Sequence, residues 1–524
     1  MSIQTSRRGF LKGAAGLSAL GMSGCCTFGC RTARVPNGTI RLAAVGVMGK
    51  GFSDWMPMIK SGLAELVAWC DADANQREAA LRHKATKKIP GLAEKLAKIP
   101  FYTDYRKMLD DQSKLQIDAM TISTPDHMHA AVAIRAMKMG IHVYVQKPLV
   151  RTLWELDYFN KTAKENGVVT QMGNQGSGTA GLRRGVEVLQ SGILGDVKEV
   201  HVWTNRPVWP QGKNVAAWVK GHPNGDPIRK GLNWDAWLGV AKMRPFLDKY
   251  PANADVYDPW KLGKNVYHTF TWRGFFDFGC GAFGDMACHT MNLPFRGLEL
   301  GAVSDAVCTT IDSENDVAYP LKSVVKLTYK ERESKARPGV KLPAVTLFWY
   351  DGDIKPDAAI MPKWAAANEG KVPNTGCIVI GTKGILCSTN DYGGESFLAL
   401  KGEKVVQNIK DHPACKVIPV TLPRCGAAGG GMDKSAGAAA LSADGHYIEF
   451  LTAIRGEGPV YTQTHSRAFS DVEYSIPQME GILVGCIAQR LPGQKLNWCS
   501  CKQSFDNAAA NAFVTPLIRK GYEF

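Results

Sequence analysis

An apolar run that ends in a glycine-rich turn limits the possible folds of this chain more than any other feature. Residues 39–46, TIRLAAVG, have the length and composition of a buried strand, and a helical pattern follows the turn. The turn contains Gly46, Met48, Gly49 and Gly51. Glycines at such a place allow the backbone to turn sharply and to approach a pyrophosphate at the start of a helix. Met48 takes the place of the middle glycine of the G-x-G-x-x-G pattern, so this turn indicates a dinucleotide site only together with its context.

An acidic residue at the end of the next predicted strand supplies that context. The strand is predicted at residues 65–70, and Asp71 follows it directly. A carboxylate there can accept hydrogen bonds from both ribose hydroxyls of an adenosine and would repel a 2′-phosphate. Asp71 could also cap the following helix, and the two roles are compatible. The pattern therefore favours NAD as the cofactor, with NADP as the alternative.

Strands and helices continue to alternate after this point. Strands are predicted at residues 115–124 and 141–146, with a helix at 130–139 between them. Nearly continuous apolar strands between helices predict a parallel sheet that is covered on both faces. Ligands of such a sheet bind beyond the carboxyl ends of its strands. Two polar segments lie at these ends: residues 123–129, STPDHMH, and the tripeptide Gln146-Lys147-Pro148.

The pattern changes to shorter alternating strands from residue 195 onward. Four of them are predicted at residues 197–203, 323–329, 344–350 and 377–380. The predicted fold class is therefore an α/β Rossmann domain followed by an α+β domain with a large open mixed sheet. A chain of 524 residues is also too long for one small core. We expect residues 1–34 to be a signal and tether, 35–170 the dinucleotide-binding domain and 171–524 the substrate-binding and catalytic domain.

Charge and cysteine spacing argue against two classes of site. The formal net charge is +15, but no basic stripe alternates with aromatic residues, so no nucleic-acid partner is expected. Attraction to acidic sugars or to an anionic surface is a milder interpretation of this charge. The 14 cysteines include no Cys-x-x-Cys pair, and Cys499-x-Cys501 and His127-x-His129 each lack a matching second half. No metal site is predicted.

The first thirty residues have the pattern of a twin-arginine export signal. Arg7 and Arg8 precede Phe-Leu-Lys and a mildly apolar run that is too short to anchor the protein permanently in a bilayer. Such a signal implies export of the folded protein by the twin-arginine machinery to the periplasm or another extracytoplasmic site. The residues before Cys25 resemble a lipoprotein cleavage box, which leaves a lipid anchor at Cys25 open.

These motifs together resemble the Gfo/Idh/MocA family, named for glucose–fructose oxidoreductase and inositol dehydrogenase. The matching segments are TPDHMH at 124–129, the tripeptide at 146–148 and Gly284-Asp285-Met-Ala-Cys-His289, and the resemblance runs from about residue 39 to the C-terminus. It implies NAD-dependent hydride transfer at a hydroxyl of a sugar, polyol or glycoside, and assembly into homo-oligomers. Gln146 departs from the family, which usually has glutamate there. An amide can still bind the nicotinamide ribose, but it supplies no charge.

The resemblance assigns the catalytic roles to Lys147, Asp285 and His289. In the family's scheme, His289 is the base, Asp285 orients it, and Lys147 stabilises the alkoxide or relays a proton. Asp285 and His289 are four residues apart on a predicted helix, so both lie on one face, where the acid could keep the pKa of the imidazole near the working range. Lys147 precedes a proline, which favours an extended backbone at the strand end.

The remaining site predictions concern the cofactor and the substrate. The predicted cofactor-binding residues are Gly46, Met48, Gly49, Gly51, Asp71, Thr124, Pro125, His129, Gln146 and Lys147. Aromatic rings stack on sugars, while arginine and asparagine bind their hydroxyls. The predicted substrate-binding residues are Asn174, Asn205, Arg206, Trp272 and Arg273.

Two other functions are compatible with these residues. The first is an NAD-dependent glycosidase, which oxidises a ring hydroxyl, eliminates the leaving group, adds water and reduces the product, without net redox change. The second is a sugar- or dinucleotide-binding protein that has lost catalysis. The reason to consider it is that Gln146 and Met48 both depart from the usual motifs.

Overall fold

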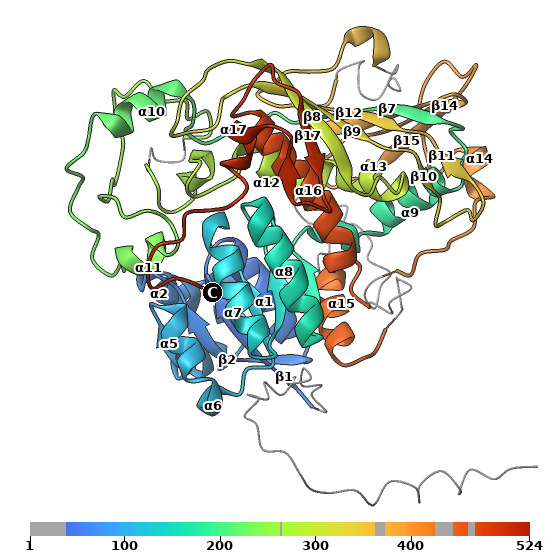
Figure 1. Cartoon of the computed structure of the whole chain (residues 1–524). Helices are drawn as coiled ribbons and strands as arrows, with labels where there is room; N and C mark the ends of the chain where they lie inside the picture. Colours follow the sequence, from blue (N-terminus) through green and yellow to red (C-terminus); the bar gives the residue numbers. More distant parts are fainter. Residues whose placement is uncertain (1–37, 262–264, 362–371, 425–443, 459–466) are drawn as a thin grey trace, which may run out of the picture.

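The computed structural model describes residues 38–261, 265–361, 372–424, 444–458 and 467–524 (Figure 1). The predicted signal and tether at 1–34, with Arg7, Arg8 and Cys25, lie outside the described residues. Within the described part of the chain, no helix is both long and apolar enough to cross a membrane.

The first domain is built on a six-stranded parallel sheet, which lies in the lower half of Figure 1. The strands are β1 (Ile40–Val45), β2 (Ala64–Cys70), β3 (Phe101–Tyr102), β4 (Ala119–Ile122), β5 (His142–Val145) and β6 (Thr170–Met172). Their order across the sheet is β3-β2-β1-β4-β5-β6, and every pairing is parallel. The order reverses between β1 and β4, so a ligand crevice is expected at the carboxyl ends of these two strands.

Helices cover both faces of this sheet, as its doubly buried strands require. Those that matter for the site are α1 (Lys50–Lys60) on one face, and α7 (His129–Lys138) and α8 (Leu153–Asn166) on the other. Helix α8 begins with a capping box, in which the side chains of Thr152 and Glu155 each accept a hydrogen bond from the other's backbone N–H. This cap fixes the start of the helix at Leu153, shortly after the polar tripeptide at 146–148.

The elements predicted for this domain are confirmed, with one correction of length. The strand expected at 115–124 is only β4, four residues long, because helix α6 (Gln112–Leu115) occupies its first position. Gln116 ends that helix in the left-handed conformation, with φ of 48°, and the strand begins three residues later. The apolar residues Leu115 and Ile117 are buried without being part of a strand, so apolar character alone overestimated its length.

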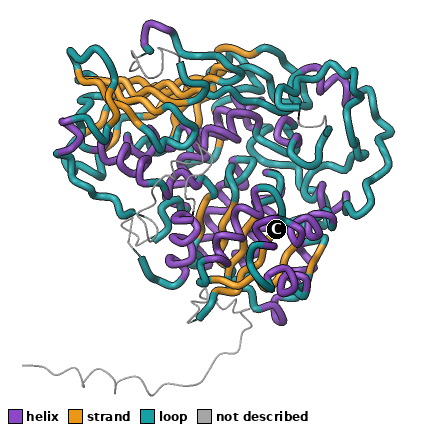
Figure 2. Tube along the Cα trace, turned by 180° about the vertical axis from the view of Figure 1, so that it is seen from behind, coloured by secondary structure: helices purple, strands orange, loops and turns teal. Residues whose placement is uncertain are grey.

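The second domain contains a ten-stranded mixed sheet, seen edge-on in the upper part of Figure 2. Its central strands are β7 (Val197–Trp203), β12 (Val345–Tyr350), β9 (Ser323–Tyr329), β8 (Val303–Ile311) and β13 (Gly376–Gly381). The outer strands are β14 (Gly384–Ser388), β15 (Ser396–Leu400), β16 (Gln407–Asn408), β17 (Leu496–Cys499) and β18 (Ser504–Phe505). Strands β7 and β12 pair in parallel, whereas the other pairings are antiparallel. The predicted fold class is therefore confirmed.

Helices between the two sheets join the domains into one body. Helix α12 (Gly281–Thr290) packs against α16 (Val472–Ala488), which also packs against α8 of the first domain and β8 of the second. Late in the chain, α15 (Asp444–Ile454) returns to the first domain and packs on α1. All side chains of α12 are buried, so residues on this helix are held rigidly at the domain boundary.

Two mostly irregular stretches, residues 205–261 and 265–279, cover one side of the first domain. They carry α10 (Lys213–Lys220) and α11 (Trp234–Leu238) and have their own aromatic core. The backbone N–H of Asn233 donates to the carbonyl of Ala72, and that of Ala74 donates to the carbonyl of Gly231. These bonds attach the first stretch to the loop after β2, beside α2 (Asn75–Arg82) in Figure 1.

Candidate active site

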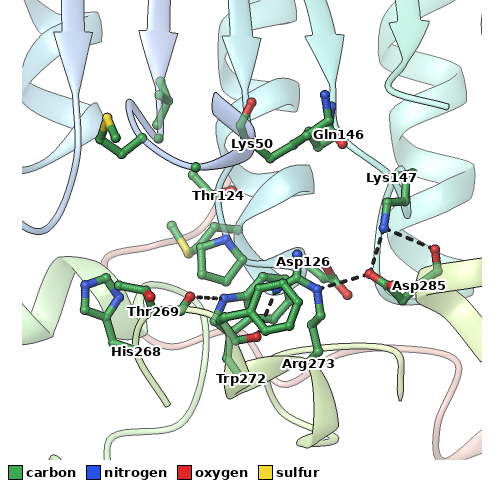
Figure 3. A pocket seen from close by; sticks show the side chains of 18 of the residues that line it. Lys50, Thr124, Asp126, Gln146, Lys147, His268, Thr269, Trp272, Arg273 and Asp285 are labelled. Atoms are coloured by element: carbon green, nitrogen blue, oxygen red, sulfur yellow. Dashed lines mark hydrogen bonds and ion pairs between the residues drawn. The ribbon is translucent and has the colours of Figure 1, made fainter. Parts of the chain in front are cut away.

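A cavity of about 470 Å³ lies between the two domains, at the carboxyl ends of β1, β2, β4 and β5 (Figure 3). Thirteen of the predicted site residues meet around it, including residues that are far apart in the sequence. They are Gly46, Met48, Gly49, Asp71, Thr124, Pro125, Gln146 and Lys147 from the first domain, and Arg206, Trp272, Arg273, Asp285 and His289 from the second. Gly51, His129, Asn174 and Asn205 do not line the cavity.

The glycine-rich turn is tightly packed at two of its glycines. A Cβ atom on Gly46, whose φ is 81°, would lie 2.4 Å from the carbonyl oxygen of Ser123. A Cβ atom on Gly51 would lie 2.0 Å from the carbonyl oxygen of Gly46, so Gly51 serves the packing of the turn. Met48 is tolerated in place of the middle glycine because its side chain packs against the core on the α1 face. The turn thus keeps the close backbone path that a pyrophosphate needs.

Asp71 lies at the cavity, as predicted, and is held by the backbone around it. Its two carboxylate oxygens accept hydrogen bonds of 3.0 Å from the N–H groups of Val47 and Asp73. Burial raises the pKa of Asp71 to about 6, against the opposing effect of these two hydrogen bonds. Each carboxylate oxygen has a second lone pair, which leaves acceptor capacity for the hydroxyls of a ribose.

His129 has a structural position rather than a contact with the cavity. Its ring nitrogens lie 2.7 Å from the carbonyl oxygen of Pro148 and 3.0 Å from that of Thr124. Burial lowers the pKa of His129 to about 4. The ring therefore joins the two polar segments, 124–129 and 146–148, at the residue that follows Lys147.

The catalytic candidates meet in one buried charge cluster. The ammonium group of Lys147 lies 2.7 Å from Oδ1 of Asp285, and Nε of Arg273 lies 3.1 Å from the same oxygen (Figure 3). The side chains of Lys147 and Asp285 are each 12% exposed. Burial alone would raise the pKa of Asp285, but the charges of Lys147 and Arg273 hold it well below its usual value. Asp285 is therefore ionised and keeps both cations at the cavity.

His289 lies one helical turn beyond Asp285 and is 4% exposed. The expectation that Asp285 keeps the pKa of His289 near the working range is wrong. Burial, and next the charge of Lys147, lower the pKa of His289 well below its usual value. Its Nδ1 has no hydrogen-bond partner, and its ring packs edge-on against Tyr392 with centroids 4.8 Å apart. The imidazole is therefore neutral and can accept a proton.

The predicted substrate residues divide into two groups. Arg206, Trp272 and Arg273 line the cavity, and the guanidinium of Arg273 lies 4.3 Å from the centre of the Trp272 ring. Asn205 does not reach the cavity, because its side chain accepts a hydrogen bond from Arg206. Asn174 is fully buried, and its neighbour Gln175 lines the cavity instead.

Several lining residues were missed by the sequence analysis. Lys50 follows the glycine-rich turn directly, and Asp126 lies inside the segment at 124–129, so both were close to recognised motifs. Burial raises the pKa of Asp126 to about 7. Trp260 and Tyr392 reach the cavity only through tertiary packing, and no spacing in the sequence marks them. Within the described residues, no group of three or more metal-ligating side chains is placed to hold a metal ion.

Comparison with known proteins identifies the first domain. Residues 40–174 match the Gfo/Idh/MocA oxidoreductase family, which has an NAD-binding Rossmann fold. The match supports the resemblance over this segment, in which the six-stranded parallel sheet has the Rossmann arrangement. The match ends at residue 174, shortly after β6.

Curated relatives align over a limited part of their length. A 2,7-anhydro-N-acetylneuraminate hydratase of Mediterraneibacter gnavus is 25% identical over 108 residues, which are 21% of this chain and 28% of that protein. The glycosyl hydrolase family 109 protein 2 of Akkermansia muciniphila is 29% identical over 169 residues, which are 30% of this chain and 33% of that protein. The aligned segment thus spans a third or less of each relative.

The fold of most of the chain has solved counterparts. An inositol dehydrogenase homologue from Azotobacter vinelandii, in complex with NADH and myo-inositol, is similar with a TM-score of 0.53. The alignment covers 89% of this chain and 100% of that one, at 15% sequence identity. At this identity the similarity shows the shared fold alone.

Proposed function

We propose that this chain is a member of the Gfo/Idh/MocA oxidoreductase family and an NAD-dependent oxidoreductase that acts on a hydroxyl of a sugar, polyol or glycoside. The match of residues 40–174 to the NAD-binding Rossmann fold of that family supports this proposal. The observation that carries the proposal is the placement of Lys147, Asp285 and His289 on the same cavity as the glycine-rich turn and Asp71. The residues fit NAD, because the packed turn keeps a backbone path for a pyrophosphate and Asp71 offers acceptors for an adenosine ribose.

The side chains can perform the proton chemistry that such an oxidation needs. NAD, when bound, supplies the hydride acceptor. The neutral imidazole of His289 accepts the proton of the substrate hydroxyl, and the ammonium of Lys147 stabilises the developing alkoxide. Asp285 holds Lys147 in place at 2.7 Å, and the charges of Lys147 and Arg273 keep the carboxylate ionised. Trp272 offers an aromatic face to the sugar and helps to exclude water.

The experiment that tests the proposal has two stages. Folded protein is first denatured, and the released nucleotide is identified by mass spectrometry. A panel of sugars, polyols and glycosides is then tested for NADH formation with the wild type and with His289→Ala. We expect NAD in the first stage and loss of turnover in the variant, with NAD affinity retained. Unchanged turnover of His289→Ala would exclude this histidine as the base.

A glycosidase is the second candidate, supported by the similarity to a glycosyl hydrolase family 109 protein. The same lysine and histidine would serve the proton transfers of such a reaction, and NAD, when bound, would supply the transient hydride acceptor. Cleavage of a nitrophenyl glycoside without net change in NADH absorbance would select the glycosidase. If the protein releases no NAD on denaturation and does not bind added NAD, the result would instead support the non-catalytic alternative.

The proposed location is outside the cytoplasm, reached by the twin-arginine route. The support is the Arg7-Arg8 pair, followed by Phe-Leu-Lys and a mild apolar run. Free NAD is scarce outside the cytoplasm, so export after folding would allow the enzyme to carry its own cofactor. Fractionation of cells that express the wild type or an Arg7→Lys, Arg8→Lys variant tests the route. Mass spectrometry of the mature N-terminus tests the lipid anchor at Cys25.

Self-association into a homo-oligomer is part of the proposal. It rests on the family resemblance and on the large sheet of the second domain, whose outer face could pair two subunits. Light scattering coupled to size-exclusion chromatography measures the subunit number directly, and a monomeric mass would contradict this expectation.

A further inference from the structure

A fully buried carboxylate on α1 has no role in the proposed reaction. Asp54 has no exposed surface, and four different side chains donate hydrogen bonds to it. The donors are Lys50 at 2.5 Å, Ser123 at 2.7 Å, Tyr447 at 2.9 Å and the amide nitrogen of Gln146 at 2.9 and 3.0 Å. A buried charge is costly unless it is paired and hydrogen-bonded, and Asp54 is both. Such a complete set of partners indicates a built site.

The network lies against the cofactor side of the cavity. Lys50, Ser123 and Gln146 all line the cavity, and they come from the start of α1 and from the ends of β4 and β5. Figure 3 shows Lys50 and Gln146 next to each other below the strand ends, apart from the cluster of Lys147, Asp285 and Arg273. Tyr447 on α15 closes the network from the other side. Asp54 therefore contacts Gln146 from behind the cavity wall.

The carboxylate determines which way the amide of Gln146 points. An ionised carboxylate only accepts hydrogen bonds, so the group that faces Asp54 has to be the amide NH₂. Because the amide is planar, its carbonyl oxygen then points away from Asp54. Gly173 packs against the NH₂ group as well, since a Cβ atom there would lie 2.5 Å from it. The amide is thereby held in one orientation.

We propose that Asp54 is a positioning residue, which makes Gln146 present only a hydrogen-bond acceptor to the bound dinucleotide, as a glutamate would. This inference rests on the proposed NAD-dependent function. The negative charge that the family usually carries at the end of this strand is carried here by helix α1, one hydrogen bond further from the cofactor. The partner of the amide oxygen would be a hydroxyl group of the nicotinamide half of NAD.

The two positions are therefore coupled. Glutamate at position 146 would place a second carboxylate about 3 Å from Asp54, where two like charges cannot both remain ionised without cost. Restoring the family's usual residue should for this reason weaken the site. Exchanging both residues should restore it, because asparagine at position 54 can donate its NH₂ to a glutamate at 146.

The test is a double-mutant cycle on nucleotide-stripped full-length protein. NAD affinity is measured by isothermal titration for the wild type, Asp54→Asn, Gln146→Glu and the double variant, and thermal unfolding is followed without NAD. Each single change is expected to weaken NAD binding about tenfold, the cost of one charged or misdirected hydrogen bond. The double variant is expected to return to within about threefold of the wild type.

A matched control separates positioning from general destabilisation. Asp351 is also a fully buried carboxylate that accepts hydrogen bonds, from Ser323 and Trp349, but it does not line the cavity. Asp351→Asn should lower thermal stability and leave NAD affinity unchanged.

Three results would overturn the inference. They are Gln146→Glu binding NAD as tightly as the wild type, a double variant no better than the weaker single variant, and an equal loss of affinity in Asp351→Asn. If the wild type itself does not bind NAD, the proposed function fails together with this inference. In the other three cases the inference alone fails.

Discussion

The charge cluster around Asp285 allows a quantitative prediction for the substitution Asp285→Asn. Asparagine keeps the size of the side chain and one acceptor oxygen, but removes the charge that holds Lys147 and Arg273. The carboxylate oxygen lies 2.7 Å from Lys147 and 3.1 Å from Arg273, and all three side chains are at most 17% exposed. Hydrogen bonds to charged groups at such places contribute about 1.5 to 3 kcal/mol each.

The substitution should therefore remove about 3 kcal/mol of stabilisation from these two contacts. The loss is no larger because asparagine can still accept one weaker hydrogen bond. If this energy is lost from the transition state, kcat/KM falls by about two orders of magnitude. The assay is initial-rate NADH formation at saturating NAD, with NAD affinity measured separately. NAD affinity should change far less than kcat/KM, since Asp285 acts through Lys147 on the substrate.

Asp351→Asn is the matched control here as well, because it removes a buried carboxylate remote from the cavity. It should leave kcat/KM within about threefold of the wild type. The reasoning is refuted if Asp285→Asn keeps more than about a third of the wild-type kcat/KM, or if the control loses as much as Asp285→Asn.

Two other predictions follow from the cofactor side of the cavity. Because the pKa of Asp71 is raised to about 6, its carboxylate becomes protonated as the pH falls through 6, and NAD binding should weaken there. Titration between about pH 5 and 8 should show this loss in the wild type and a flat profile in Asp71→Asn, and a flat wild-type profile would contradict it. Gly46→Ala should unfold at a clearly lower temperature than the wild type, because its Cβ would meet the carbonyl oxygen of Ser123 at 2.4 Å. Gly49→Ala is the control, since it has a similar φ of 60° with open space around it, and equal melting temperatures for the two variants would argue against the steric cause.

Much of the first domain could be predicted because its signals are local. The apolar run, the turn at Gly46 and the acid at Asp71 lie within a short stretch of chain, and strand and helix periodicity is a property of neighbouring residues. The parallel pairing of the strands followed from the alternation of strands and helices, whereas their order across the sheet came from the structure. The predicted length of β4 was wrong for the same reason. A buried apolar residue outside a strand, such as Leu115, cannot be told by its local pattern from one inside a strand.

The site was predicted where a motif marked it and missed where packing made it. Lys147 and His289 were found through segments of recognisable spacing. The low pKa of His289 was not, because it depends on burial and on Lys147, which is distant in the sequence. Trp260 and Tyr392 reach the cavity from loops that carry no periodic signal.

The sequence by itself determined the glycine-rich turn, the acid after β2 and the two-domain fold class, since each depends on spacing along the chain. Only the tertiary structure decided which charges meet. Asp285 pairs with Lys147 and Arg273, and Asp54 reaches Gln146 and Tyr447 across most of the chain. The physical reason is that hydrogen bonds and desolvation act over a few ångströms in space, and distance along the sequence does not measure that separation. The sequence shows that position 146 carries an amide instead of a charge. The buried carboxylate of Asp54, which contacts that amide, is visible only in the tertiary structure.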